Sequence, residues 1–324
     1  MTDNRSSADP VLTANLYARG RLDAVIAEVI APLRRAMGEA GWLWFLRYPK
    51  GGEHLKLRGY AEAPQVPTLR HELAARFARF AEDGKGTDTP GPAVGRSLPA
   101  IDLEDDVESP YPNLTLRWTE YRPSAVSLGG GPLLEDATYR ELFGRAAASC
   151  CERLVGLMAA PRSGLLTAGG RLRILVEIVS TSLAGLGWSR ERLAAYFSYH
   201  RDWIIRLPLL GRRQAGNSIA RLEERARTSA ISGSLMAGLR VSEEEARPLV
   251  NFVDYLRRFE GDPVYVIDPF AEGPVFPALF KVLHGVSNAC GLRMTQERFA
   301  YHLLLRGEDR VAALRPVTLR PSAG

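Results

Sequence analysis

Apolar and polar positions alternate near the start of the chain, and this alternation predicts a β-hairpin. Trp42–Tyr48, WLWFLRY, is typical of a strand, PKGGE of a tight turn, and His54–Tyr60, HLKLRGY, of a return strand with strict alternation. Successive side chains of a strand point to opposite faces of a sheet. His54, Lys56 and Arg58 are therefore expected to share one face. A further alternating strand is expected within NLTLRWTEYRP.

Helical spacing of apolar residues covers most of the remaining chain. An amphipathic helix is expected over residues 23–39, ended by Gly41. Further helices are expected over 68–82, after the glycine turn in SLGGGPLLEDATYR, and near 168–186, 189–206, 213–228, 243–260, 276–290 and 294–306. DPVYVIDPF is expected to add one short strand. The segment 83–112, rich in Gly, Pro and acidic residues, is expected to be a long loop.

Strands early and helices late predict an α+β fold, in which an antiparallel sheet packs with a largely helical C-terminal half. We expect residues 1–324 to form a single domain. Apolar residues make up 46% of the chain and charged residues 24%, values typical of folded globular proteins. The N-terminus lacks the basic-then-apolar order of a signal peptide, and no apolar run is long enough to span a membrane. These features predict a cytoplasmic protein without a membrane partner.

Charge and cysteine content exclude several classes of function. The net charge is +5, but the basic residues are scattered over the helices, so we expect no nucleic-acid partner. The three cysteines, two adjacent and one distant, fit neither a disulfide framework nor a metal site, and are expected to be free and mostly buried. Phosphate-binding GxxxxGK[ST], HExxH, GxSxG and CxxC motifs are all absent. We therefore expect neither a metal nor a cofactor.

Two groups of polar residues remain as candidate sites. The first is the cationic hairpin, in which Arg47 lies on one strand and His54, Lys56 and Arg58 line the other. It fits either an exposed, solubilising sheet face or a platform that holds carboxylates or a peptide backbone.

The second group interrupts an apolar helix that ends at Gly291. His284, Ser287 and Asn288 are spaced i, i+3 and i+4 and so share one helix face. A histidine near a helix C-terminus has its charged form favoured, which suits a proton donor or shuttle. The alternative is a buried polar trio satisfied by backbone carbonyls.

The hairpin sequence WLWFLRYPKGGEHLKLRGY, preceded by LYARGRLDAVIAEVIAPL, resembles the C-terminal, elimination-type domain of lantibiotic dehydratases, in the stand-alone form found in thiopeptide biosynthesis. In that family an aromatic-rich strand carries an Arg-Tyr pair, followed by a turn and His-Leu-Arg-Leu-Arg. Here Arg47 and Tyr48 match the pair, and Lys56 replaces one Arg. The resemblance extends through YRPSAVSLGGG to LHGVSNACG and so covers most of the chain.

The resemblance implies one of two chemistries on a ribosomally made peptide. Some members eliminate glutamate from glutamylated Ser or Thr; others join two dehydroalanines in a formal [4+2] aza-cycloaddition that forms a pyridine-type ring and expels the leader peptide. Eliminating members typically carry Glu and Arg where this chain has Ser124 and Ser127, and a His and an Arg where it has Val286 and Ala289. Glutamate elimination needs cations for two carboxylates and a base, so these losses favour the cyclase.

The resemblance thus implies a pyridine synthase whose substrate is a precursor peptide with its leader. Its candidate catalytic residues are Ser287, His284 and Tyr199; its candidate substrate-binding residues are Arg47, His54, Lys56, Arg58, Trp118 and Asn288. Trp118, with Trp188, Phe197 and Trp203, is a candidate for stacking on azole rings of the substrate. The glutamate-eliminating lyase and a non-catalytic leader-binding partner stay open as alternatives, as does a homodimer. Replacing Arg47 or Arg58 with Ala is expected to weaken peptide binding and to spare the fold.

Overall fold

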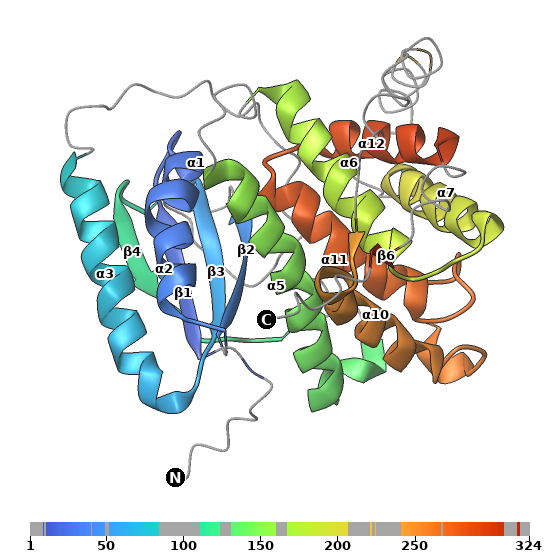
Figure 1. The fold of residues 1–324 in the computed structure, drawn as a ribbon, viewed down its shortest axis with the longest axis horizontal. Coiled ribbons are helices and arrows are strands. Elements are labelled where there is room, and N and C mark those ends of the chain that lie inside the picture. The colour runs from blue at the N-terminus through green and yellow to red at the C-terminus, as the bar shows by residue number, and fades with distance from the viewer. Residues whose placement is uncertain are drawn as a thin grey trace, which may run out of the picture.

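The computed structural model of the 324-residue chain describes residues 9, 11–39, 41–48, 52–83, 111–123, 131–159, 167–206, 221, 224, 241–266, 268–307 and 316–317. A sheet formed by early strands occupies one side of the molecule and most of the later helices occupy the other (Figure 1). The long helix α5, Ala137–Ala159, lies between the two. The α+β fold predicted from the sequence is confirmed.

The main sheet has four antiparallel strands in the order β2-β3-β1-β4. They are β1, Leu12–Tyr17; β2, Trp42–Tyr48; β3, His54–Tyr60; and β4, Thr115–Trp118. The predicted hairpin is β2-β3. Strand β1 was not predicted, although its sequence, LTANLY, alternates as a strand should. It pairs with both β3 and β4, so it holds the sheet together.

The helices follow the predicted apolar spacing, with a few differences in their bounds. They are α1, Leu22–Val25, and α2, Ala31–Ala36, joined by a π-helical turn Ile26–Ile30; α3, Val66–Asp83; α5; α6, Ala168–Ala184; α7, Arg190–Arg206; α10, Glu243–Arg257; α11, Val275–Ala289; and α12, Met294–Arg306. Short 3-10 turns cover Ala63–Gln65, Gly131–Glu135 and Pro263–Tyr265, and β5, Val241–Ser242, pairs in parallel with β6, Pro316–Val317.

Two local predictions are wrong. The described residues of DPVYVIDPF, 262–266 and 268–270, do not form the expected strand, because Asp262 accepts a hydrogen bond from the backbone N–H of Val264 (2.9 Å) and starts a 3-10 turn there. The first helical segment ends before Gly38, whose φ of +68° suits glycine, rather than at Gly41. The predicted helix near 213–228 and the loop predicted at 83–112 lie almost wholly outside the described residues, and the single domain stays a prediction.

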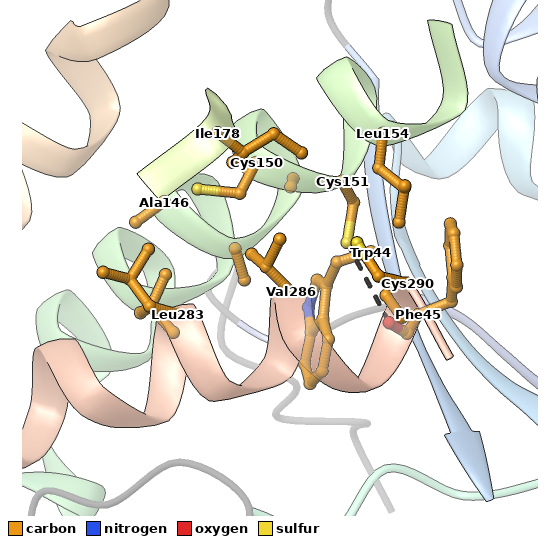
Figure 2. Packing of buried hydrophobic residues seen from close by; sticks show 14 of the residues in the cluster. Trp44, Phe45, Ala146, Cys150, Cys151, Leu154, Ile178, Leu283, Val286 and Cys290 are labelled. Carbon is orange, nitrogen blue, oxygen red and sulfur yellow. Dashed lines mark hydrogen bonds between the residues drawn. The ribbon is translucent and has the colours of Figure 1, made fainter. Parts of the chain in front are cut away.

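Helix α5 joins the sheet to the helical half through a continuous apolar core (Figure 2). Trp44 and Phe45 of β2 meet side chains of α5 and α11 there. All three cysteines are free and buried in the structure, as predicted, and the thiol of Cys151 lies 3.9 Å from the carbonyl oxygen of Phe45. Burial raises the pKa of Cys151 to about 12, so the thiol is protonated near neutral pH.

The contact of α5 with the β-hairpin gives a stability prediction. The rings of Trp42 and Tyr60 stack with centroids 3.4 Å apart, and a Cβ added at Gly144 would lie 2.7 Å from the Trp42 ring. We therefore expect Gly144→Ala to lower the free energy of unfolding by about 1–3 kcal/mol through overpacking. Gly156→Ala, in the same helix with nothing within 4 Å, is the matched control and should be neutral or stabilising by about 0.4–1 kcal/mol. Urea denaturation compares the two; equal effects would contradict the packing argument.

Candidate active site

The register of the hairpin separates Arg47 from the other three cations. Directly paired residues of antiparallel strands share a face, and Arg47 pairs with Leu55 whereas His54 pairs with Tyr48. Arg47 therefore lies on the opposite face from His54, Lys56 and Arg58. The cationic hairpin therefore does not present all four residues on one platform. Alternation fixes the faces within one strand, and the register fixes them between strands.

The Arg47 side chain caps the C-terminus of α11. Its Nε donates to the carbonyl oxygen of Ala289 (2.7 Å), and Arg171 donates to that of Cys290 (2.7 Å). Both guanidinium groups also bind Asp23, at the start of the first helical segment. Burial alone would raise the pKa of Asp23, but the two arginines outweigh it and hold this pKa below its usual range. These contacts satisfy terminal helix carbonyls and join α1, β2, α6 and α11.

The three cations on the other face are held against aromatic rings and backbone. His54 is 1% exposed, its Nδ1 lies 2.7 Å from the carbonyl oxygen of Gly52, and its ring lies 4.4 Å from that of Tyr17. The Nζ atom of Lys56 lies 3.8 Å from the Tyr48 ring centroid, and Arg58 donates to the carbonyl oxygen of Leu57 (3.0 Å). The exposed, solubilising face is therefore wrong for His54 and Lys56. Their role in substrate binding stays a prediction.

Other substrate-binding candidates lie apart from one another. Trp118 is 38% exposed at the end of β4, with the guanidinium of Arg70 4.9 Å from its ring. Trp188 and Phe197 are buried in the core. Trp203, in contrast, is only half-buried and lies near His284, with ring centroids 6.4 Å apart. Ser124 and Ser127, which depart from the family pattern, lie outside the described residues.

Asn288 connects α11 to β2, whereas Ser287 lies buried in the core. The Oδ1 of Asn288 accepts a hydrogen bond from the backbone N–H of Arg47 (2.6 Å), which satisfies a donor on the outer edge of β2. The Ser287 side chain is completely buried, and within the described part of the chain its hydroxyl has no hydrogen-bond partner. Its role as a catalytic residue stays a prediction.

His284 belongs to a chain of three hydrogen-bonded side chains from three helices. Its Nδ1 lies 2.8 Å from one carboxylate oxygen of Glu297, in α12, and the other oxygen lies 2.7 Å from Nε2 of His200, in α7. We call these residues the His–Glu–His chain. Glu297 is 1% exposed and His200 0%, whereas His284 is 31% exposed. The chain therefore runs from the protein interior to the surface.

The protonation states in the His–Glu–His chain follow from its burial and its contacts. Burial opposes ionisation of Glu297, but both histidines favour it and hold the pKa of Glu297 at about 2. Burial lowers the pKa of His200 to about 4 against the pull of Glu297. Near neutral pH Glu297 is thus ionised and His200 neutral. Each histidine donates an N–H to the carboxylate, which leaves Nε2 of His284 as the nitrogen free to exchange a proton.

Aromatic rings surround the His–Glu–His chain. Phe280 lies parallel to His284, with centroids 5.3 Å apart, and Tyr301 stacks on His200 at 3.4 Å. The Tyr199 ring packs edge-on against Phe280 at 6.5 Å, but its hydroxyl donates to Asp268 (2.7 Å). Tyr199 therefore contacts this aromatic layer with its ring, while its proton is engaged elsewhere.

Neither His200 nor Glu297 was predicted from the sequence. A signal for Glu297 exists, since Glu297, Tyr301 and Leu304 are spaced i, i+4 and i+7, and the carboxylate thus interrupts an otherwise buried helix face. A buried carboxylate is unusual unless it is paired. His200 has the weaker signal of a polar residue next to the aromatic run AYFSY.

The His–Glu–His chain lies on a helical scaffold and has the geometry that an acid–base site requires. An imidazole fixed by a carboxylate can accept or donate a proton at its free nitrogen, as in the catalytic triads of hydrolases. Among the described residues, no group of three or more His, Cys, Asp or Glu side chains is arranged to hold a metal ion. Within the same residues no single helix is long and apolar enough to cross a membrane, and the bent pair α11–α12 passes that test by length and composition only.

Comparison with known proteins identifies the fold. The chain is similar to the tRNA-dependent lantibiotic dehydratase MibB from Microbispora sp. 107891, with 18% identity, a TM-score of 0.53, and coverage of 95% of this chain and 28% of MibB. The chain thus spans little more than a quarter of that enzyme's length. The resemblance to lantibiotic dehydratases stated from the sequence is confirmed at the level of the fold.

Two further solved structures align over nearly their whole length. They are the pyridine synthase TbtD from thiomuracin biosynthesis, with 15% identity, 93% of this chain and 98% of TbtD covered and a TM-score of 0.48, and TsrL, with 14% identity, 94% and 99% covered and a TM-score of 0.46. No protein-family model and no curated protein matches the chain.

Proposed function

We propose that the protein is an enzyme of peptide maturation that joins two dehydroalanines of a ribosomally made precursor in a formal [4+2] aza-cycloaddition. The observation that carries the proposal is the His–Glu–His chain, which presents one partly exposed imidazole next to aromatic rings. The hairpin motif of the sequence and the lantibiotic-dehydratase fold support the same class of substrate.

The chemistry needs proton transfers and positioning. A backbone amide first moves its N–H proton to its carbonyl oxygen, which forms the hydroxy-azadiene. Two C–C bonds then close the six-membered ring, one from each carbon end of the azadiene to the second alkene; the hydroxyl leaves as water with one proton, and the leader leaves as its amide with another. His284 Nε2 would accept and return these protons in turn, since Glu297 holds its other nitrogen. Holding the two alkenes together lowers the activation barrier further, by on the order of 7–11 kcal/mol in favourable cases.

Neutral rings near His284 suit this reaction. Trp203 and Phe280 offer flat surfaces for azole rings of the substrate, and the Nζ atom of Lys281 lies 5.5 Å from the Trp203 ring centroid. Lys281 also favours the second candidate, elimination of glutamate, because it could bind a carboxylate of the leaving group while His284 removes the α-proton.

Mass spectrometry separates the candidate functions. The purified protein is incubated, with no added cofactor, with an azole-bearing peptide containing two dehydroalanines, and separately with the same peptide carrying glutamylated Ser. Loss of water together with release of the leader amide supports the cyclase. Loss of glutamate from the second peptide alone would make the protein a lyase. Tight binding of both peptides with no change in mass would make it a leader-binding partner.

A further inference from the structure

The hydrogen-bonded chain does not stop at the pair formed by the partly exposed His284 and the buried Glu297. Beyond Glu297 it continues to His200, and from His200 Nδ1 to the hydroxyl of Tyr196 at 3.2 Å. Both residues are completely buried, and Tyr301 stacks on the His200 ring. A substrate that reaches His284 would therefore not contact His200 in this structure. The buried half of the His–Glu–His chain therefore has a role other than contact with the substrate.

Hydrogen-bond direction assigns every proton in this buried half. A carboxylate can only accept, so His200 must carry a proton on Nε2 to bond Glu297. A neutral His200 then has its acceptor at Nδ1, where the Tyr196 hydroxyl donates. The remaining oxygen of Glu297 accepts from Nδ1 of His284. This pattern leaves one proton arrangement in which each of these three contacts is satisfied.

We propose that His200 is a positioning residue: as a neutral imidazole it anchors one oxygen of Glu297, so that the other oxygen fixes the tautomer and ring orientation of His284. The role in catalysis rests on the function proposed above, whereas the tautomer itself does not. His200 keeps its proton throughout. Within the His–Glu–His chain, His284 alone exchanges protons with the substrate. The same logic governs buried partners that orient a catalytic or ligating histidine in other enzymes.

The charged and titratable groups around His200 and Glu297 are compatible with a neutral His200. They are Tyr196 and Tyr199 of α7; Tyr301 of α12; Cys150 of α5; His284 and Cys290 of α11; and, on the neighbouring turns, Arg298, which donates to the Arg201 carbonyl oxygen and lies 3.8 Å from Asp202. Burial raises the pKa of both Tyr196 and Tyr301 well above its usual value. Both therefore stay protonated, and among the described residues Glu297 is the anion that His200 bonds directly.

Two substitutions separate positioning from proton transfer. In His200→Gln the amide N–H can still donate to Glu297 and the amide oxygen can still accept from Tyr196, but the side chain cannot titrate. In His200→Leu both bonds are lost. We expect kcat/KM on the dehydroalanine peptide to fall no more than about threefold in the Gln variant and about 10–100-fold in the Leu variant, with the loss in kcat rather than in KM.

A second readout does not depend on activity. In ¹⁵N NMR spectra of the imidazoles, His284 should carry its proton on Nδ1 in the wild type and in His200→Gln, and should become a mixture of tautomers in His200→Leu. The wild-type free energy of unfolding should fall as the pH is lowered from 6.5 to 4, because the unfolded chain binds a proton that the buried His200 resists until about pH 4. His200→Gln should lose less stability over that range.

Each result has a definite meaning. An equal loss of activity in both variants would show that His200 transfers protons and would overturn the proposal, as would an unchanged His284 tautomer in a folded His200→Leu. If the Leu variant does not fold, the activity of the Gln variant and the pH dependence of stability still test the positioning role of His200. If the wild type converts no peptide, the proposed function fails, and the tautomer measurement still tests the positioning role.

Discussion

His284→Gln is expected to lower kcat/KM for the peptide reaction by about 10²–10⁴-fold, the usual contribution of a positioned acid–base group. The Gln amide can replace the imidazole in its hydrogen bond to Glu297, since the wild-type contact is an N–H donated to a carboxylate. It cannot take up or release a proton near neutral pH. The expected loss is therefore chemical, and appears in single-turnover rates of product formation followed by mass spectrometry.

The control for this variant is His71→Gln. His71 is exposed on α3, at a distance from the helices that carry the His–Glu–His chain, and should react at the wild-type rate with the wild-type Tm. The His284→Gln protein should also keep its Tm within a few degrees. If His284→Gln formed product as fast as His71→Gln, the proton carrier would have to lie elsewhere, and Ser287 would become the leading candidate.

Arg47→Ala is expected to lower the free energy of unfolding by about 1.5–3 kcal/mol, the range for a lost hydrogen bond to a charged group. The side chain bonds a terminal carbonyl of α11 and the carboxylate of Asp23, and both partners are at least half-buried. Its loss leaves Asp23 with Arg171 alone. The expectation from the sequence, that this substitution weakens peptide binding and spares the fold, stays a prediction; the contacts of Arg47 add an expected cost in stability.

Arg58→Ala is the matched comparison, because Arg58 lies on the adjacent strand but on the opposite sheet face. Its guanidinium donates to the neutral carbonyl oxygen of Leu57 and lies 5.9 Å from the Tyr121 ring centroid, whereas Arg47 binds a carboxylate. We therefore expect Arg58→Ala to lower the free energy of unfolding by less than Arg47→Ala does. Urea denaturation measures both variants, and a peptide-binding titration accompanies it. Weaker peptide binding by Arg47→Ala at unchanged stability would restore the substrate-binding role and would argue against a structural one.

The hairpin shows which structural features a local sequence pattern can predict. Alternation correctly placed β2 and β3 and the shared face of His54, Lys56 and Arg58, because strand periodicity is a property of neighbouring residues. The face of Arg47 depended on the pairing of two strands and on the helices packed against them, which no single strand encodes. Strand β1, LTANLY, carries the same alternating signal, although it was not predicted.

The candidate site shows what local sequence spacing cannot predict. His284 stood out because it interrupts an apolar helix, but its partner Glu297 lies on the next helix and His200 lies 97 residues before Glu297 in the chain. Contacts between distant helices arise from packing, so spacing alone could not join the three residues. The sequence indicated that each polar residue lies on a buried helix face and therefore needs a hydrogen-bond partner. It did not indicate which residue that partner is.

The peptide's binding place is tested most directly by ¹⁵N NMR of the wild-type imidazoles, titrated with the dehydroalanine peptide at low temperature. The chain has five histidines, so single substitutions can assign each signal. We expect the peptide to shift the His284 resonances of the wild type while those of His71 stay in place. A shift at His54 with none at His284 would put the peptide on the cationic sheet face and contradict His284 as the reacting centre.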